Sequence, residues 1–153
     1  IAAIANATAG EAEIEVWAFG RVPLAISARC YHARLHGRTK DSCQFVCEND
    51  RDGLRVDTLD AERFLAINGV QTLSHTYCNL ILEAKPLAGI GVSALRLSPH
   101  TCDMVAVARV FRDVLDGLCA PSPALERLRT IAPDAAFSNG FVRGMNGASY
   151  VAE

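Results

Sequence analysis

The sequence predicts an α/β fold, and three observations support this prediction. A segment with helical spacing at residues 1–8 is followed by an alternating, strand-like segment at 13–19. Further along the chain, strand-like and helix-like segments alternate, an order typical of parallel strands joined by right-handed crossovers. The length of 153 residues fits one domain with a core of its own. Together these observations indicate the connectivity found in barrels and doubly wound sheets.

The first third of the chain changes from regular to irregular. Ile1, Ile4 and Ala5 have helical spacing but no N-cap residue precedes them, so we expect the chain to begin inside a helix of a larger domain. The strand at 13–19 places apolar residues at alternate positions. Across residues 20–52 this periodicity is lost while Cys, Arg, His and Gly accumulate. This composition predicts an irregular segment organised around a functional site.

Turn and capping residues separate the later elements. Gly89 and Gly91 close one predicted helix, and Asp103 lies at the start of another. The predicted elements are strands at 54–56, 64–68 and 92–97, helices at 75–88, 101–115 and 124–131, and a Gly-rich tail at 138–148. The first two of these strands are separated by a polar turn and are expected to pair as a hairpin.

Composition excludes several partners and locations. The net charge is -2 and charged residues make up 21% of the chain, so it carries no electrostatic footprint for nucleic acid or an anionic membrane. No stretch reaches the roughly 18 consecutive apolar residues of a membrane span. Residues 1–9 lack the features of a signal peptide, and the cysteine density is below that of a secreted disulfide scaffold. We therefore expect a cytoplasmic protein without a membrane span.

The strongest functional signal is the C-x12-C-x3-C run formed by Cys30, Cys43 and Cys47. Thiolates are soft ligands that suit iron-sulfur clusters and zinc. Both kinds of centre usually take four protein ligands, so the run is one ligand short. Three unrelated buried thiols are the alternative, because cysteine often packs as a small apolar residue. The polar neighbours of Cys43 and Cys47 argue against that alternative and predict a ligand loop.

Two histidines beside the run leave zinc open as a rival metal. His32 and His36 form an H-x3-H pair, which together with Cys43 and Cys47 gives the two-Cys, two-His count of a tetrahedral zinc site. The order is reversed relative to the common zinc finger. Histidines with structural hydrogen bonds are the commoner explanation of such a pair.

Cys78 is the reserve candidate for a fourth ligand. It lies near the predicted start of the helix at 75–88, where the helix dipole favours a thiolate. A buried thiol on the apolar face of that helix is the more common situation.

No other motif predicts a catalytic site. The chain has no G-x-G-x-x-G segment and no Walker loop, so nothing indicates nucleotide binding. Ser27 and Ser74 lack a nucleophile elbow, and no proteolytic constellation is visible. Peptidase activity is therefore not expected, and no catalytic acid or base is predicted.

Several strings in the chain carry a family resemblance. The string FGRVPLAISARC, which ends at Cys30, and the K-D-x-C-x3-C string that ends at Cys47 resemble collagenase-like peptidase family U thirty-two. Within that family the strings are most similar to the branch called UbiV. The strings at 64–74 and 139–141 are similar to the same branch, so the resemblance covers nearly the whole chain.

The resemblance implies a fold and a cofactor. The fold is expected to be the C-terminal half of a TIM-like barrel over residues 1–153, with an irregular cysteine-bearing cluster loop and with the N-terminal half missing. The cofactor is expected to be an oxygen-sensitive 4Fe-4S cluster, with zinc as the alternative. Cys30, Cys43 and Cys47 match three cluster ligands of the branch, while its fourth ligand lies in the N-terminal half, and Cys78 stays in reserve.

The resemblance also implies a function and partners. We expect an iron-sulfur subunit of oxygen-independent ubiquinone biosynthesis, which supports anaerobic ring hydroxylation of the quinone precursor. The expected partners are a UbiU-like protein in a heterodimer and a UbiT-like lipid-binding protein. The alternatives are an RNA-hydroxylating or zinc-binding member of the same family, or a noncatalytic scaffold for the UbiU-like partner.

Overall fold

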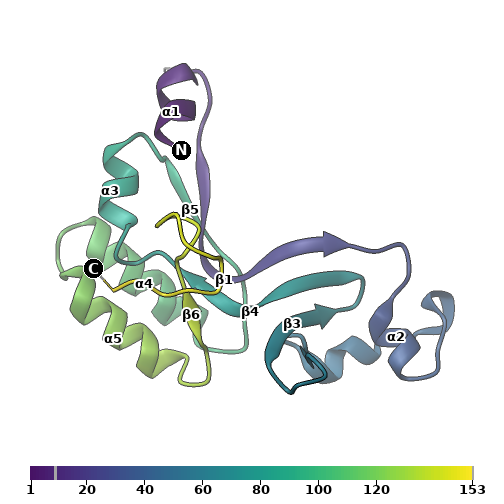
Figure 1. The fold of residues 1–153 in the computed structure, drawn as a ribbon. Helices are drawn as coiled ribbons and strands as arrows, with labels where there is room; N and C mark the ends of the chain where they lie inside the picture. Colours follow the sequence, from purple (N-terminus) through teal and green to yellow (C-terminus); the bar gives the residue numbers. More distant parts are fainter. Residues whose placement is uncertain (9, 153) are drawn as a thin grey trace. The chain divides into compact units, whose positions relative to one another are not determined.

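The longest strand, β1 (Glu15–Ile26), takes part in both structural units of the chain. The computed structural model describes residues 1–8 and 10–152. Unit 1 comprises residues 1–20 and 78–153, and unit 2 comprises residues 21–77. The chain leaves unit 1 along β1 and returns to it along β4 (Gln71–Asn79), as Figure 1 shows. Where it returns, the backbone N–H of Leu80 donates a hydrogen bond to the carbonyl of Ala18 at 2.9 Å.

Unit 1 combines a parallel strand pair with helices. The first residues of β1 pair in parallel with β5 (Ala94–Leu97), which confirms the parallel strands predicted from the element order. The helices of unit 1 are α1 (Ala2–Thr8), α3 (Ala84–Gly89), α4 (Met104–Leu115) and α5 (Pro121–Ile131), and β6 (Phe137–Ser138) pairs with β4. The predicted strand at 92–97 and the predicted helices at 101–115 and 124–131 are therefore confirmed within a few residues.

The core of unit 1 is built on one face of α4 and on β1. The buried residues of α4 recur with the helical period and are Val107, Val110, Phe111 and Val114. The side chain of Phe19 in β1 is completely buried. Its ring packs edge to face against Phe111, with 6.2 Å between the ring centroids, and against Phe137, with 6.1 Å. The amphipathic pattern that predicted α4 thus also places its core.

Asp103 caps α4, as the sequence predicts. Its carboxylate accepts a hydrogen bond from the backbone N–H of Ala106 at 2.9 Å. Replacing Asp103 with alanine removes this acceptor and is expected to lower the free energy of unfolding by about 1 kcal/mol, measured by urea unfolding. Asp103→Asn is the matched control, because asparagine is an equally good N-cap. Equal losses for the two variants would contradict the capping role.

The prediction of a helix at 75–88 is wrong for residues 75–83. Residues 71–79 form β4, which pairs antiparallel with β3 (Arg63–Asn68), and only α3 is helical in this region. The pairing with β3 covers residues 71–74, and the two threonines and the tyrosine of β4 are β-branched or aromatic residues that favour strands. Pro86 lies in the first turn of α3, where no helical hydrogen bond needs its missing N–H. The proline therefore fits a short helix and not the longer predicted one.

Unit 2 contains an antiparallel hairpin and the cysteine-bearing segment. β2 (Leu54–Asp57) pairs antiparallel with β3, which confirms the hairpin predicted from the two short strands. The prediction of an irregular segment across 20–52 is wrong at its start, because β1 continues to Ile26. Pro23, which has no N–H to donate, and the lack of apolar alternation hide this part of the strand in the sequence.

The strand order is β2-β3-β4-β1-β5, with β6 paired to β4. Parallel pairing joins β1 to β5, while β2 to β3 and β3 to β4 are antiparallel. The fold is therefore a mixed α/β arrangement. The expectation that the chain forms the C-terminal half of a TIM-like barrel stays a prediction.

The C-terminal segment of unit 1 is held by a buried carboxylate. Glu83 is 6% exposed, and its Oε1 accepts hydrogen bonds from Asn139 Nδ2 at 2.9 Å and from Arg143 Nε at 2.7 Å. Asn139 in turn accepts a hydrogen bond from the backbone N–H of Val151 at 2.7 Å. Charge-assisted hydrogen bonds of this kind are stronger than neutral ones. The Gly-rich tail predicted at 138–148 is thus fixed to unit 1 at several points.

The helices of the chain are short. The longest one described, α4, spans 12 residues. Within the described part of the chain, no helix has both the length and the apolar character needed to cross a membrane.

Candidate metal centre

Cys30 lies at the start of α2 (Tyr31–Leu35) in unit 2. It is the N-cap residue of this helix, and its Sγ accepts a hydrogen bond from the backbone N–H of Ala33 at 3.4 Å. The residue is 9% exposed, and like the other five cysteines it is a free thiol. Hydrogen bonds from N–H groups stabilise a charged sulfur and tune iron-sulfur clusters. Cys30 is therefore a buried N-cap residue whose sulfur accepts one backbone N–H.

Cys43 and Cys47 follow in two short 3₁₀ helices, η1 (Lys40–Ser42) and η2 (Val46–Asp50). Cys43 is the C-cap residue of η1, and its Sγ accepts a hydrogen bond from the backbone N–H of Phe45 at 3.4 Å. Cys47 lies within η2, and both thiols are half-buried. Two of the three predicted ligands thus receive a backbone N–H on sulfur.

The backbone between Cys43 and Cys47 is strained. Gln44 and Phe45 both adopt the left-handed conformation, with φ angles of 50° and 52°. Such conformations cost about 1 to 3 kcal/mol for each non-glycine residue and cluster at functional sites. The side chain of Phe45 is 70% exposed, so burial of its ring does not offset the strain. The strained turn directs the Phe45 N–H to the sulfur of Cys43.

The three thiols do not converge on one point. Among residues 1–8 and 10–152, the group of His, Cys, Asp or Glu side chains with all ligand atoms within 4.8 Å of one another contains none of these cysteines. A tetrahedral zinc ion with Zn–S bonds of about 2.3 Å requires thiolates about 3.8 Å apart. In an iron-sulfur cluster each thiolate binds a different iron atom, so the sulfurs can be farther apart. Among the described residues, the three cysteines therefore do not form a single-ion zinc site.

Cys78, the reserve ligand, lies in unit 1 near the end of β4 instead of at a helix start, so the predicted helix dipole is not there. Its Sγ donates a hydrogen bond to the carbonyl of Trp17 at 3.5 Å. Burial, with a smaller contribution from the carboxylate of Glu83, raises the pKa of the Cys78 thiol to about 12. This environment favours the neutral thiol over the thiolate that a metal binds.

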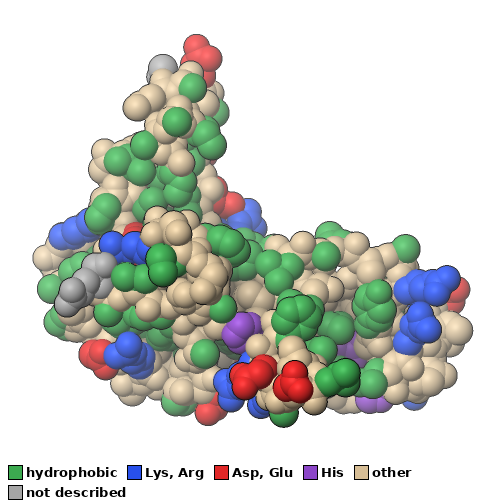
Figure 2. All heavy atoms as spheres, in the orientation of Figure 1, with side chains coloured by type: hydrophobic (Ala, Val, Ile, Leu, Met, Phe, Trp, Pro, Cys, Tyr) green, Lys and Arg blue, Asp and Glu red, His purple; other side chains and the backbone are tan. Residues whose placement is uncertain are grey.

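A basic pocket lies beside Cys30. Its volume is about 350 Å³, and it is lined by Ala28, Arg29, Cys30, Arg34, Arg38, Thr39 and Lys40. Lys and Arg side chains gather on the surface of unit 2 around α2, as Figure 2 shows. Four cationic side chains and no carboxylate line the pocket, so it attracts negative charge. A thiolate-bound cluster or a small anion would be stabilised there.

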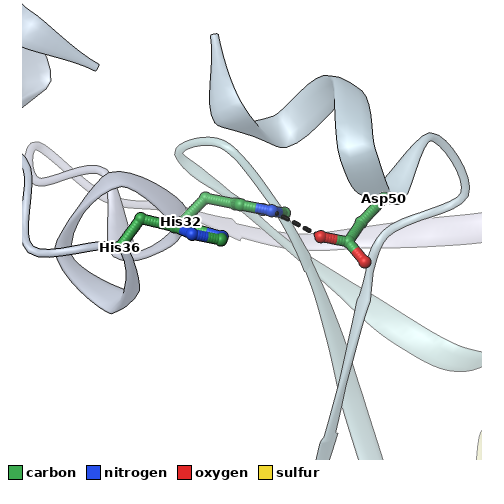
Figure 3. Close-up of side chains that lie close together, drawn as sticks. All are labelled: His32, His36 and Asp50. Carbon is green, nitrogen blue, oxygen red and sulfur yellow. Dashed lines mark hydrogen bonds and ion pairs between the residues drawn. The ribbon is translucent and has the colours of Figure 1, made fainter. Parts of the chain in front are cut away.

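The two histidines of the predicted zinc set lie next to an aspartate and not next to the cysteines. His32, His36 and Asp50 place one ligand atom each within 4.8 Å of one another (Figure 3). The Nε2 of the fully buried His32 is hydrogen-bonded to Asp50 Oδ2 at 2.8 Å, and the two imidazole rings stack with 5.9 Å between centroids. The structure therefore does not assemble the two-Cys, two-His set.

The sequence predicted the histidine pair but missed Asp50. The H-x3-H spacing is visible because it corresponds to one helical turn. Asp50 lies in a segment without periodicity, and only the folding of η2 brings it to the histidines. No pattern in the sequence identifies it as their partner.

Comparison with models of protein families matches residues 1–151 to the model described as Peptidase family U32. No solved structure matches the chain significantly.

Proposed function

Because the chain belongs to peptidase family U32, we propose that it is a UbiV-like iron-sulfur subunit of oxygen-independent ubiquinone biosynthesis. The observation that supports the proposal is the cysteine-bearing segment of unit 2, in which Cys30 and Cys43 accept backbone N–H groups on sulfur. The strings around these cysteines resemble the UbiV branch. The proposed role is to support anaerobic hydroxylation of the ring of the quinone precursor.

The residues around the cysteines support this role through their chemistry. Cys30, Cys43 and Cys47 would hold a 4Fe-4S cluster, with a fourth ligand from another residue. When bound, the cluster would supply electron transfer to the hydroxylation. The backbone N–H groups of Ala33 and Phe45 stabilise the charged sulfurs. The cationic side chains that line the basic pocket beside Cys30 offset the negative charge of a thiolate-bound centre.

The proposed partners are a UbiU-like protein in a heterodimer and a UbiT-like lipid-binding protein, in the cytoplasm. Exposed apolar side chains on the cysteine-bearing segment support a protein partner. Tyr31, Leu35 and Phe45 are 49%, 66% and 70% exposed. A contiguous apolar patch formed by these side chains would be typical of an interaction surface.

The metal content of the full-length protein tests the cofactor. Protein purified without oxygen is expected to contain about four iron and four sulfide per chain, as a 4Fe-4S cluster requires. Iron and sulfide are measured chemically, and the oxidation state is followed by electron paramagnetic resonance. A colourless protein with stoichiometric zinc and neither iron nor sulfide would contradict the proposal.

Deletion of the gene tests the pathway. Ubiquinone is expected to disappear from cells grown without oxygen and to stay unchanged in aerated cells. Quinones extracted from both cultures are quantified by chromatography, and a plasmid copy of the gene is the control. Unchanged anaerobic ubiquinone together with altered RNA hydroxylation would favour the RNA-modifying alternative.

A further inference from the structure

The histidine and aspartate group of unit 2 has the composition of a second metal site. His32 lies in α2, His36 is the C-cap residue of the same helix, and Asp50 ends η2. The two histidines are four positions apart, so one helical turn places both rings on the same side. Their rings are nearly parallel, with an angle of 8° between the ring planes. Two segments of the chain thus deliver three donors to one place.

One buried ring nitrogen of this group has no hydrogen-bond partner among the described residues. His32 is completely buried, and its Nε2 is paired with Asp50 Oδ2 at 2.8 Å. Its other ring nitrogen, Nδ1, is also buried and has no hydrogen-bond partner among the described residues. Buried polar atoms without a partner are uncommon and call for an explanation such as an ion. The hydrogen bonds of the described residues therefore leave one nitrogen of the His32 ring unused.

The three ligand atoms are close enough for one ion to bind all of them after an exchange of the hydrogen bond between His32 and Asp50. All three ligand atoms lie within 4.8 Å of one another. A tetrahedral ion with metal–ligand bonds of about 2.0 to 2.2 Å holds its donors about 3.3 to 3.6 Å apart, so only small side-chain movements are needed. His36 is exposed and the side chain of Asp50 is 31% exposed, so both can move and both offer access from solvent.

The donors select the class of ion. Imidazole nitrogen and carboxylate oxygen suit zinc and the neighbouring divalent transition metals. Magnesium and calcium prefer ligands that are all oxygen. We propose that His32, His36 and Asp50 bind one divalent transition-metal ion, with zinc as the ion best suited to the set. The proposal does not depend on the iron-sulfur role, because none of its ligands is a thiol.

Cobalt(II) in place of zinc tests the site and separates it from the cysteines. The full chain with Cys30, Cys43 and Cys47 replaced by serine is titrated with CoCl₂ without oxygen. We expect one equivalent to bind, with visible d–d absorption and without the near-ultraviolet charge-transfer band of a cobalt thiolate. Zinc is expected to displace the cobalt. A folded variant, judged by circular dichroism, that binds no cobalt would overturn the proposal.

Single substitutions identify the ligands. In the same background, His36→Ala and Asp50→Asn are each expected to weaken cobalt binding at least about tenfold. His75→Ala is the matched control, because His75 is a partly exposed histidine of unit 2 outside the group. Unchanged affinity in His36→Ala, or an equal loss in His75→Ala, would contradict the assignment.

A second measurement covers the case in which the serine variant does not fold. The histidine ring resonances of the wild-type full chain are then followed by NMR during titration with ZnCl₂. Changes confined to His32 and His36 would support the site. Changes absent from both rings at saturating zinc would overturn it. Because these readouts contain neither iron nor sulfide, failure of this proposal is distinguishable from failure of the proposed function.

Discussion

Replacing Cys30 with serine is expected to lower the iron and sulfide content of the anaerobically purified full-length protein at least about tenfold, since loss of a ligand exceeds the effect of changes around the ligands. Serine is a suitable replacement because Cys30 is the N-cap residue of α2 and serine is among the best N-caps. The helix is therefore kept while the thiolate is lost. The measurement is chemical iron and sulfide analysis, accompanied by circular dichroism.

Cys78→Ser is the matched control for the Cys30 variant. The Cys78 thiol lies in unit 1, where burial disfavours the thiolate, so this variant is expected to keep its iron and sulfide. A Cys30→Ser protein with full iron content would contradict the assignment of Cys30 as a ligand. A Cys78→Ser protein that loses its iron would instead make Cys78 the fourth ligand.

Phe19→Ala is expected to lower the free energy of unfolding by about 3 to 5 kcal/mol, because it leaves a cavity in the core of unit 1. The ring is fully buried and packs edge to face against both Phe111 and Phe137. Small domains are stable by only about 5 to 15 kcal/mol, so this single change removes a large part of the total. Urea unfolding followed by circular dichroism measures the effect.

The control for this variant is Phe64→Ala. The side chain of Phe64 is 54% exposed, so its truncation is expected to change the free energy of unfolding by about 0.5 kcal/mol or less. Comparable losses for the two variants would contradict the placement of the core around Phe19.

Elements with a strong periodic pattern were predictable from the sequence. The apolar face of α4 and its Asp103 cap are local signals, and the structure reproduces both. β4 was missed because a strand is stabilised by its neighbours, and its pairing with β3, β1 and β6 leaves no mark in the local pattern. The second half of β1 was missed because the apolar periodicity is lost after residue 19, and Pro23, which has no N–H to donate, is uncommon inside strands.

The candidate site was predictable in its residue types and less so in its geometry. The spacing of Cys30, Cys43 and Cys47 predicts a ligand loop, but the N–H bonds to sulfur depend on backbone angles that no residue type predicts. Asp50 meets the histidines only through the fold of η2. For Cys78 the wrong secondary structure also led to a wrong prediction about the thiol. The sequence predicts a helix dipole that favours the thiolate, whereas burial in β4 favours the neutral thiol.

The hydrogen bond between Ala18 and Leu80 has a consequence for how this chain tolerates change in length. The two residues bracket the whole of unit 2, yet they are direct neighbours in unit 1. Residues 21–77 are therefore topologically an insertion, whose two ends leave the host from adjacent points. The entropy of closing such a loop grows only slowly with the number of residues inside it. Changes in the length of this cysteine-bearing insertion are therefore expected to leave the strand pairing between β1 and β5 in place.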